Sequence, residues 1–380
     1  MQYSKFKTVD REISLLGLGL MRLPMDEEGK VDAQYGVDLI RYAVDHGINY
    51  LDTGYTYHGG ESERIIGKAL KDGYREKVIL ADKLPMWMIE TKEDVVRIFN
   101  DQFDRLGVDH IDMYLVHNVV PDAWETVKKL DILGFLDEMK ARGRIGHIGF
   151  SFHGEYDLFT EVIDAYPWEF CQIQINYLDK DEQATLKGLE YARVRGIDVI
   201  VMEPLKGGRI TDKVPAQVQA IWERAKAEGV APAGRTPAEW AFRWVASQPG
   251  VSLILSGMGN EQQLDENITV FSQEDFRTMT EQEYEIIDEV AAYYNSTVKY
   301  QCTSCRYCLP CPAEIEIPEV IGFVNNWISF DHIPSTKTEY IFDFDAHGSD
   351  CIQCGHCVDN CPQSLPVMEI MKEAAACFGK

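Results

Sequence analysis

Apolar residues gather in short runs that are separated by longer amphipathic stretches. Each run is nearly continuous in apolar residues over six or seven positions, which is typical of a strand buried on both faces of a parallel sheet. Between the runs, segments such as 36–47, 62–72 and 93–106 repeat their apolar positions at helical spacing. The eight runs lie at 13–19, 48–53, 78–83, 111–117, 145–151, 171–176, 198–203 and 251–257.

This alternation of strands and helices predicts an α/β fold, a (β/α)8 TIM barrel, because eight units over roughly 250 residues is the count and length of that fold. An open doubly wound sheet is the alternative, but no glycine-rich dinucleotide fingerprint follows the first strand. Helix N-terminal signals begin at Thr236 and at Thr280. We expect the barrel to occupy residues 1–296 and a small, mainly helical domain to occupy 297–380.

Four polar residues stand at neighbouring strand ends, where the chemistry of a TIM barrel is found. Asp52, Lys83 and His117 lie at the ends of the second, third and fourth runs, and Tyr57 follows the second. One such residue alone is best explained as a strand cap, but four together predict a site. A lysine ammonium should lower the pKa of a neighbouring tyrosine, and an aspartate would keep that lysine charged. With a histidine to orient a carbonyl, the set predicts a general acid for carbonyl reduction.

The stretches LDTGYTYHGGESERIIGKAL, LADK, YLVH, GFS and EPLKGG occur in this order on the expected strands. Through them, residues 10–295 resemble the aldo-keto reductase family. The resemblance implies that Tyr57 is the proton donor, that Lys83 and Asp52 tune it, and that His117 orients the substrate. It also implies a small carbonyl or alcohol substrate and a nicotinamide cofactor bound across the strand ends.

The same resemblance suggests which residues hold the cofactor. Ser151 and Gln172 match the contacts to the carboxamide, and Met202 stands where many relatives pack an aromatic ring against the nicotinamide. Gly257 and Gln263 occupy the places of a lysine and an arginine that bind the 2′-phosphate of NADP in relatives, so NAD and NADP both remain open. The diphosphate-binding loop and the adenine-end segment add Pro204, Leu205, Lys206, Gly207, Arg209, Gly257, Gln263, Glu266 and Asn267.

Eight of the ten cysteines lie between residues 302 and 361. The second run has the spacing C-x2-C-x2-C-x3-C-P that is used for [4Fe–4S] ligation, and the first run differs only in a last gap that is one residue shorter. A zinc site is the alternative, but two tandem runs that each close with Cys-Pro argue against it. The predicted ligands of two [4Fe–4S] clusters are Cys302, Cys305, Cys308, Cys311, Cys351, Cys354, Cys357 and Cys361.

The two cysteine runs belong to an internal repeat. Counted from the fourth cysteine of each run, matching positions hold similar residues, with a cysteine loop followed by a helix in each copy. The matched pairs are Ile315 and Leu365, Ile317 and Val367, and Glu319 and Glu369. The tail therefore resembles a two-cluster ferredoxin module. Between the runs, over residues 313–350, we expect one helix and the aromatic stretch YIFDFD.

Composition narrows the choice of partners. The chain is 45% hydrophobic and carries a formal net charge of −25, which argues against nucleic acid and anionic membranes. No apolar run is long enough to cross a bilayer, and the N-terminus lacks the layout of a signal peptide. We therefore expect a cytoplasmic protein.

Three functions remain open from the sequence. In the first, a nicotinamide-dependent reductase carries clusters that are structural or redox-sensing. In the second, the clusters exchange electrons with an external one-electron carrier. In the third, the barrel is a non-catalytic redox or nucleotide sensor, against which the Asp–Tyr–Lys–His set argues. The second function must join two-electron hydride transfer to one-electron clusters, and no motif requires the flavin that usually bridges them.

Overall fold

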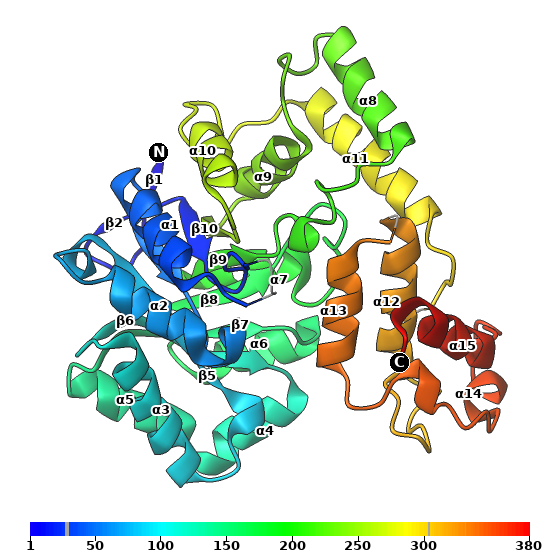
Figure 1. Ribbon diagram of the computed structural model, residues 1–380, viewed down its shortest axis with the longest axis horizontal. Helices are drawn as coiled ribbons and strands as arrows, with labels where there is room; N and C mark the ends of the chain where they lie inside the picture. The colour runs from blue at the N-terminus through cyan, green and yellow to red at the C-terminus, as the bar shows by residue number, and fades with distance from the viewer. Residues whose placement is uncertain (27–29, 303–304, 331) are drawn as a thin grey trace. The chain divides into compact units, whose positions relative to one another are not determined.

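The computed structural model describes residues 1–26, 30–302, 305–330 and 332–380. The chain divides into two compact units, whose elements are labelled in Figure 1. The first unit comprises Met1–Lys206 and Ala238–Thr280, and the second comprises Gly207–Pro237 and Glu281–Lys380. None of the helices in the described ranges is long and apolar enough to cross a membrane.

The first unit is a closed barrel of parallel strands, which confirms the predicted fold (Figure 1). Around the barrel the strands follow the order β10-β3-β4-β5-β6-β7-β8-β9. The polar residues at the ends of β4, β5 and β6 are therefore brought side by side, as the sequence predicted. The strands are β3 (Leu16–Gly19), β4 (Tyr50–Asp52), β5 (Ile79–Pro85), β6 (Ile111–Val119), β7 (Ile145–Phe152), β8 (Phe170–Gln174), β9 (Asp198–Met202) and β10 (Val251–Ser256).

Helices that connect the strands, together with α10 after the last strand, surround the barrel (Figure 1). Helix α3 shows how their ends are set: Thr91 and Asp94 form a reciprocal capping box at its start, and Gly107 ends it in the left-handed conformation with φ 63°. The helices are α1 (Ala33–Asp45), α2 (Glu61–Ala69), α3 (Lys92–Leu106), α4 (Pro121–Leu130), α5 (Ile132–Ala141), α6 (Tyr156–Ala165), α7 (Thr185–Arg195), α9 (Pro237–Ser247) and α10 (Glu261–Val270).

The first predicted strand, 13–19, is in fact two strands of different sheets. Strand β2 (Glu12–Ser14) pairs antiparallel with β1 (Tyr3–Lys5), and the barrel strand β3 begins only at Leu16. Between them the Leu15 amide donates to the Gln2 carbonyl at 2.9 Å. The apolar run is unbroken because both strands are buried, so its pattern does not reveal the change of partner.

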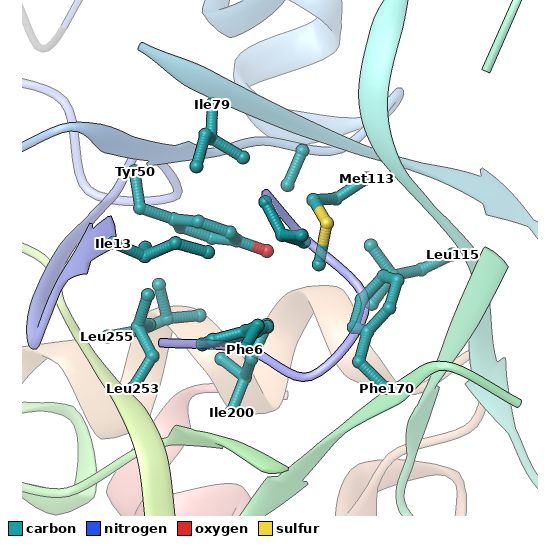
Figure 2. Packing of buried hydrophobic residues seen from close by; sticks show 12 residues of the cluster. Phe6, Ile13, Tyr50, Ile79, Met113, Leu115, Phe170, Ile200, Leu253 and Leu255 are labelled. Carbon is teal, nitrogen blue, oxygen red and sulfur yellow. The ribbon is translucent and has the colours of Figure 1, made fainter. Parts of the chain in front are cut away.

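Side chains from the N-terminal segment and from the barrel strands converge on one buried cluster (Figure 2). Phe6 and Ile13 enter it from the N-terminal segment, while Tyr50, Met113 and Phe170 come from barrel strands. Gly149 on β7 makes room for this packing, because an added Cβ would lie 2.6 Å from the Phe170 ring. The interior below the strand ends is therefore filled, which leaves the strand ends for chemistry.

The described part of the second unit is helical. Its core joins α12 and α15, which directly follow the two cysteine runs, through residues such as Val320, Val324 and Ile370. Ion pairing between Arg224 and Glu289 links α8 to α11. The helices are α8 (Ala216–Ala227), α11 (Glu281–Ser296), α12 (Ile317–Ser329), α13 (Pro334–Asp343), α14 (His356–Asp359) and α15 (Val367–Phe378).

The expectation of a single helix between the cysteine runs is wrong. Two helices, α12 and α13, lie there, and the first four residues of the YIFDFD stretch belong to α13. Tyr340 is fully buried and stacks on Phe378, with ring centroids 4.2 Å apart. Tyr340 also contacts Phe344, four residues on, so tertiary packing of aromatic rings gives this stretch a structure that its composition does not indicate.

Helices α2 and α3 pack closely where Gly67 faces the end of α3. An added Cβ at Gly67 would lie 2.5 Å from the Leu106 carbonyl oxygen, which belongs to the backbone and cannot move cheaply. We expect Gly67→Ala to lower the free energy of unfolding by about 2 kcal/mol, measured by urea denaturation. Lys68→Ala, at the next and exposed position of the same helix, should change it by less than about 0.5 kcal/mol. Equal effects of the two substitutions would contradict the close contact.

Candidate active site

The four residues predicted at the strand ends meet in the structure. Asp52 ends β4, Lys83 lies in β5 and His117 lies in β6. The backbone then turns so that the Tyr57 amide donates to the Gly54 carbonyl at 3.0 Å, which starts a 3-10 turn over Tyr57–Gly60. Neighbouring strands thus supply three of the four side chains, and the turn that follows β4 supplies Tyr57.

A buried ion pair lies at the base of the site. Lys83 Nζ is 2.5 Å from Asp52 Oδ1, and the two side chains are 0% and 4% exposed. Lys83 also donates to the Thr53 carbonyl. A buried ammonium is stable only when it has such partners, so this pair holds the Lys83 charge in one place.

Tyr57 and His117 lie over this ion pair. Lys83 Nζ is 5.2 Å from the centroid of the Tyr57 ring, and the Tyr57 and His117 rings meet edge to face with centroids 6.0 Å apart. Gly54 allows this approach, since an added Cβ would lie 3.1 Å from Tyr57 Cζ and 3.3 Å from His117 Cε1. Any side chain at position 54 would push against both rings.

Burial dominates the electrostatics of the site. Desolvation raises the pKa of Tyr57 above its usual value and the Lys83 charge opposes this, so the expected net lowering by Lys83 is not found. Burial alone would lower the pKa of Lys83, but Asp52 and Tyr57 outweigh it and the pKa lies above the usual value. Burial, Lys83 and His153 hold the pKa of His117 well below its usual value. At neutral pH the site therefore holds a neutral phenol, an ammonium and a neutral imidazole.

Two further residues adjoin the site and were missed from the sequence. The Trp87 ring packs against His117 with centroids 4.9 Å apart, while its side chain remains 53% exposed. His153, just past β7, is close enough to act on His117, and burial lowers its own pKa to about 4. Both residues lie just after barrel strands. A sequence search that included the loops after the strand ends would have found them.

One of the residues predicted to contact the carboxamide, Gln172, has a buried oxygen that could accept a hydrogen bond. Gln172 is 3% exposed, and its Nε2 lies 3.6 Å from Met202 Sδ. Its Oε1 is buried and has no hydrogen-bond donor among the described residues. Ser151 Oγ accepts a hydrogen bond from the Asn118 amide at 2.8 Å. An amide N–H of a bound carboxamide would satisfy the Gln172 oxygen, so this corner of the barrel fits that group.

Both cations of the predicted diphosphate loop are paired within the protein. Lys206 Nζ lies 2.6 Å from Asp179 Oδ1, and that carboxylate is buried. Arg209 is also buried, donates to Thr336 Oγ1 at 3.1 Å and forms an ion pair with Glu339, both on α13. The loop 204–209 spans the boundary between the units, with Lys206 in the first and Gly207 in the second. These partners lie far along the chain and could not be read from the sequence.

The predicted adenine-end residues lie at and after the end of β10. Gln263 Oε1 accepts from the Gly259 amide at 2.8 Å, and Asn267 Nδ2 donates to Ser256 Oγ at 3.3 Å. Glu266 accepts from Gln262 on the exposed side of α10. An added Cβ at Gly257 would lie 3.3 Å from the aliphatic part of the Arg22 side chain, a neighbour that the sequence did not single out.

The predicted cysteine ligands line two cavities of the second unit. Among the described residues, no three histidine, cysteine, aspartate or glutamate side chains group closely enough for a single metal ion. Cys302, Cys305, Cys308 and Cys361 line the first cavity. Cys308, Cys311, Cys351, Cys354 and Cys357 line the second.

The described residues of the two cysteine regions share two backbone features. The position four residues after the first cysteine has a positive φ in both, 61° at Arg306 and 82° at Gly355. The position three residues after the fourth cysteine does too, with 59° at Glu314 and 52° at Ser364. Such values are uncommon outside glycine, so their recurrence at matched positions supports the internal repeat.

Comparisons with known proteins agree with both halves of this description. The model of the Aldo/keto reductase family matches residues 15–292, and the model of the 4Fe-4S dicluster domain matches residues 301–365. Probable aldo-keto reductase 1 of Glycine max is 29% identical over 298 residues, which cover 70% of this chain and 84% of that protein. The NADH-specific methylglyoxal reductase of Escherichia coli (strain K12) is 27% identical over 312 residues, which cover 70% and 92%.

A solved structure shows the same fold. The holo form of an aldo-keto reductase from Bacillus halodurans aligns with a TM-score of 0.62 at 23% identity, over 76% of this chain and 96% of that one. Because the family model covers well over half of the sequence, the chain belongs to the aldo/keto reductase family of oxidoreductases and carries a 4Fe-4S dicluster domain in its C-terminal region.

Proposed function

We propose that the first unit reduces a small carbonyl compound, or oxidises the matching alcohol, with Tyr57 as the proton donor. The observation that carries this proposal is the buried pair of Lys83 and Asp52 beneath the Tyr57 and His117 rings. Membership of an oxidoreductase family supports it. The arrangement suits a reaction in which a hydroxyl group loses its proton next to a fixed positive charge.

The proton step follows from the charges of the site. Tyr57 is protonated at neutral pH because burial raises its pKa, so its hydroxyl can donate to a carbonyl oxygen. The phenolate that remains is stabilised by the Lys83 ammonium, which Asp52 keeps charged and in place. His117 is neutral, and its ring can hold the carbonyl oxygen by a hydrogen bond while the exposed Trp87 forms an aromatic wall. The reverse direction uses the same groups to remove a proton from an alcohol.

The proposed cofactor is NAD or NADP, which when bound supplies the hydride. The Gln172 oxygen without a donor and the neighbouring Ser151 fit its carboxamide. Pro204, Leu205 and Gly207 remain the proposed diphosphate contacts. Lys206 and Arg209 would have to leave Asp179 and Glu339 to add their charges. At the adenine end, Gly257, Gln263, Glu266 and Asn267 stay proposals, and the absence of a cation at 257 and 263 keeps the choice between the two cofactors open.

We also propose that the cysteine region binds two [4Fe–4S] clusters with crossed ligation. Two cavities that are each lined by cysteines of both runs support this arrangement. Zinc holds four ligands at about 2.3 Å and would need a tighter group than any that the described residues form. Cys302, Cys305, Cys308 and Cys361 would hold one cluster, and the other four cysteines would hold the second. When bound, the clusters supply one-electron redox centres.

A second function, electron exchange with an external one-electron carrier, is favoured by the exposure of one cysteine in each run. Cys305 and Cys354 are exposed, and so are the nearby Tyr307 and Ile352, at 67% and 64%. Each proposed cluster would therefore have an edge at the surface. Electron transfer across a protein contact needs such an edge, whereas a purely structural cluster does not.

Replacing Tyr57 tests the reductase proposal. We expect Tyr57→Phe to lower the rate of carbonyl reduction at least about 100-fold, because the ring stays and only the proton donor is lost. Cofactor affinity, measured by fluorescence titration with NADH and NADPH, should change by less than about threefold. The control is Tyr55→Phe, whose hydroxyl donates to Asp101 at 3.1 Å outside the site. Near wild-type turnover of Tyr57→Phe would show that another group is the acid.

Pairs of cysteine substitutions test the ligation. With crossed ligation, Cys305 and Cys361 serve the same cluster, so the Cys305→Ser/Cys361→Ser protein should keep about four of about eight irons and the matching sulfide. Cys354 and Cys361 serve different clusters, so Cys354→Ser/Cys361→Ser should lose nearly all iron. The measurement is iron and acid-labile sulfide per chain after anaerobic purification. If each run holds its own cluster, the two double variants exchange their results.

A further inference from the structure

A second buried charged group lies on the other side of β5 from the active site. Consecutive residues of a strand point to opposite faces, so Lys83 turns toward Asp52 while Asp82 turns toward helices α2 and α3. Asp82 and Glu63 of α2 are both 0% exposed. The reaction proposed for Tyr57 has no need of either carboxyl group, so their burial beside the catalytic lysine calls for an explanation.

The contacts of these two groups leave one oxygen of each without a donor. Asp82 Oδ1 accepts from the Lys83 amide at 2.8 Å, and Glu63 Oε2 accepts from Arg105 Nη1 at 2.7 Å. The two carboxyl groups face each other. Asp82 Oδ2 and Glu63 Oε1 are buried, and within the described residues neither has a donor from any other group. Two ionised carboxylates cannot satisfy each other, whereas one shared proton would satisfy both oxygens.

The balance of charges around β5 also favours one shared proton. The charged groups on both sides of β5 include three buried acids, Asp52, Glu63 and Asp82, and two cations, the buried Lys83 and the partly buried Arg105. A third full negative charge would be buried without a counterion, which is costly compared with keeping one proton.

Desolvation raises the pKa of both carboxyl groups. Burial raises the pKa of Glu63 to about 7 against the effect of Arg105. Burial and the nearby Glu63 raise the pKa of Asp82 well above its usual value. The two groups titrate together, so the proton belongs to the pair.

We propose that Asp82 and Glu63 share one proton at neutral pH and act as a positioning pair for the Tyr57 site. While the pair keeps its proton, the Lys83 charge is available to the Tyr57 phenolate that forms during reduction. This inference rests on the function proposed for Tyr57 and extends it to a residue pair that does not touch the substrate.

Loss of the shared proton should slow carbonyl reduction. An ionised Asp82 would place a negative charge next to Lys83, and that charge opposes formation of the Tyr57 phenolate. The effect appears as the pH rises, because the pair is protonated at low pH and ionised at high pH. The charged and titratable groups that face the pair are Lys83 with Asp52 and Tyr57 beyond it, Arg64 on α2, Arg105 on α3 and Tyr114 on β6.

Infrared spectroscopy of the native protein tests the shared proton without any substrate. We expect the C=O stretch of a buried protonated carboxyl group at neutral pH, which shifts in D2O and vanishes as the pH is raised. Asp82→Asn should remove this band. If wild-type protein shows no such band at neutral pH, the shared proton does not exist, whatever the fate of the Tyr57 proposal. The wild-type spectrum tests for the shared proton even if the Asp82→Asn protein does not fold.

The pH dependence of turnover tests the link to Tyr57. Asp82→Asn mimics the protonated group, so its rate at neutral pH should stay within about threefold of wild type. At alkaline pH the wild type should lose about tenfold in kcat through ionisation of the pair, and Asp82→Asn should not show this loss. Asp101→Asn on α3, which removes a carboxylate that does not face Lys83, is the control. An unchanged alkaline limb in folded Asp82→Asn, or an equal change in Asp101→Asn, would overturn the positioning role.

Discussion

The need to keep one ammonium charged in a buried place governs this active site. Lys83 is 0% exposed, and a lysine so buried tends to lose its proton unless an anion lies against it. Asp52 supplies that anion, but only because β4 and β5 pair in a register that sets Asp52 beside Ala81, two residues before Lys83. The position of the charge beside Tyr57 is therefore determined by the strand pairing of the barrel.

The same strand places charge on both of its faces. Toward the barrel interior Lys83 meets Asp52, and toward the helices Asp82 meets Glu63 and, through it, Arg105. Because Lys83, Asp52, Asp82 and Glu63 are all buried, a change of charge on one face acts on the other with little screening. A barrel strand of this kind is both a support and an electrostatic connection, so in the proposed mechanism Asp82 could influence Tyr57 without touching the substrate.

The sequence revealed those parts of the site that follow from local periodicity. Asp52, Lys83 and His117 could be placed because strands buried on both faces are recognisable and their ends are where a barrel reacts. Trp87 was missed because it lies in the short turn after β5, beyond the strand ends that were searched. The partners of Lys206 and Arg209 lie 27 and about 130 residues away, and one sequence contains no signal for such pairs.

In the second unit, cofactor ligation and packing concern the same short segments. Ile317 and Val367 lie in the hydrophobic core, and each follows the fourth cysteine of its run by six residues. In the proposed crossed ligation that fourth cysteine is bound to the cluster of the other run. Helices α12 and α15, which pack together in that core, would then each be tied to the opposite cysteine loop. Cluster binding would therefore stabilise the contact between the two repeats, which explains why the repeat extends beyond the cysteines into the helices that follow them.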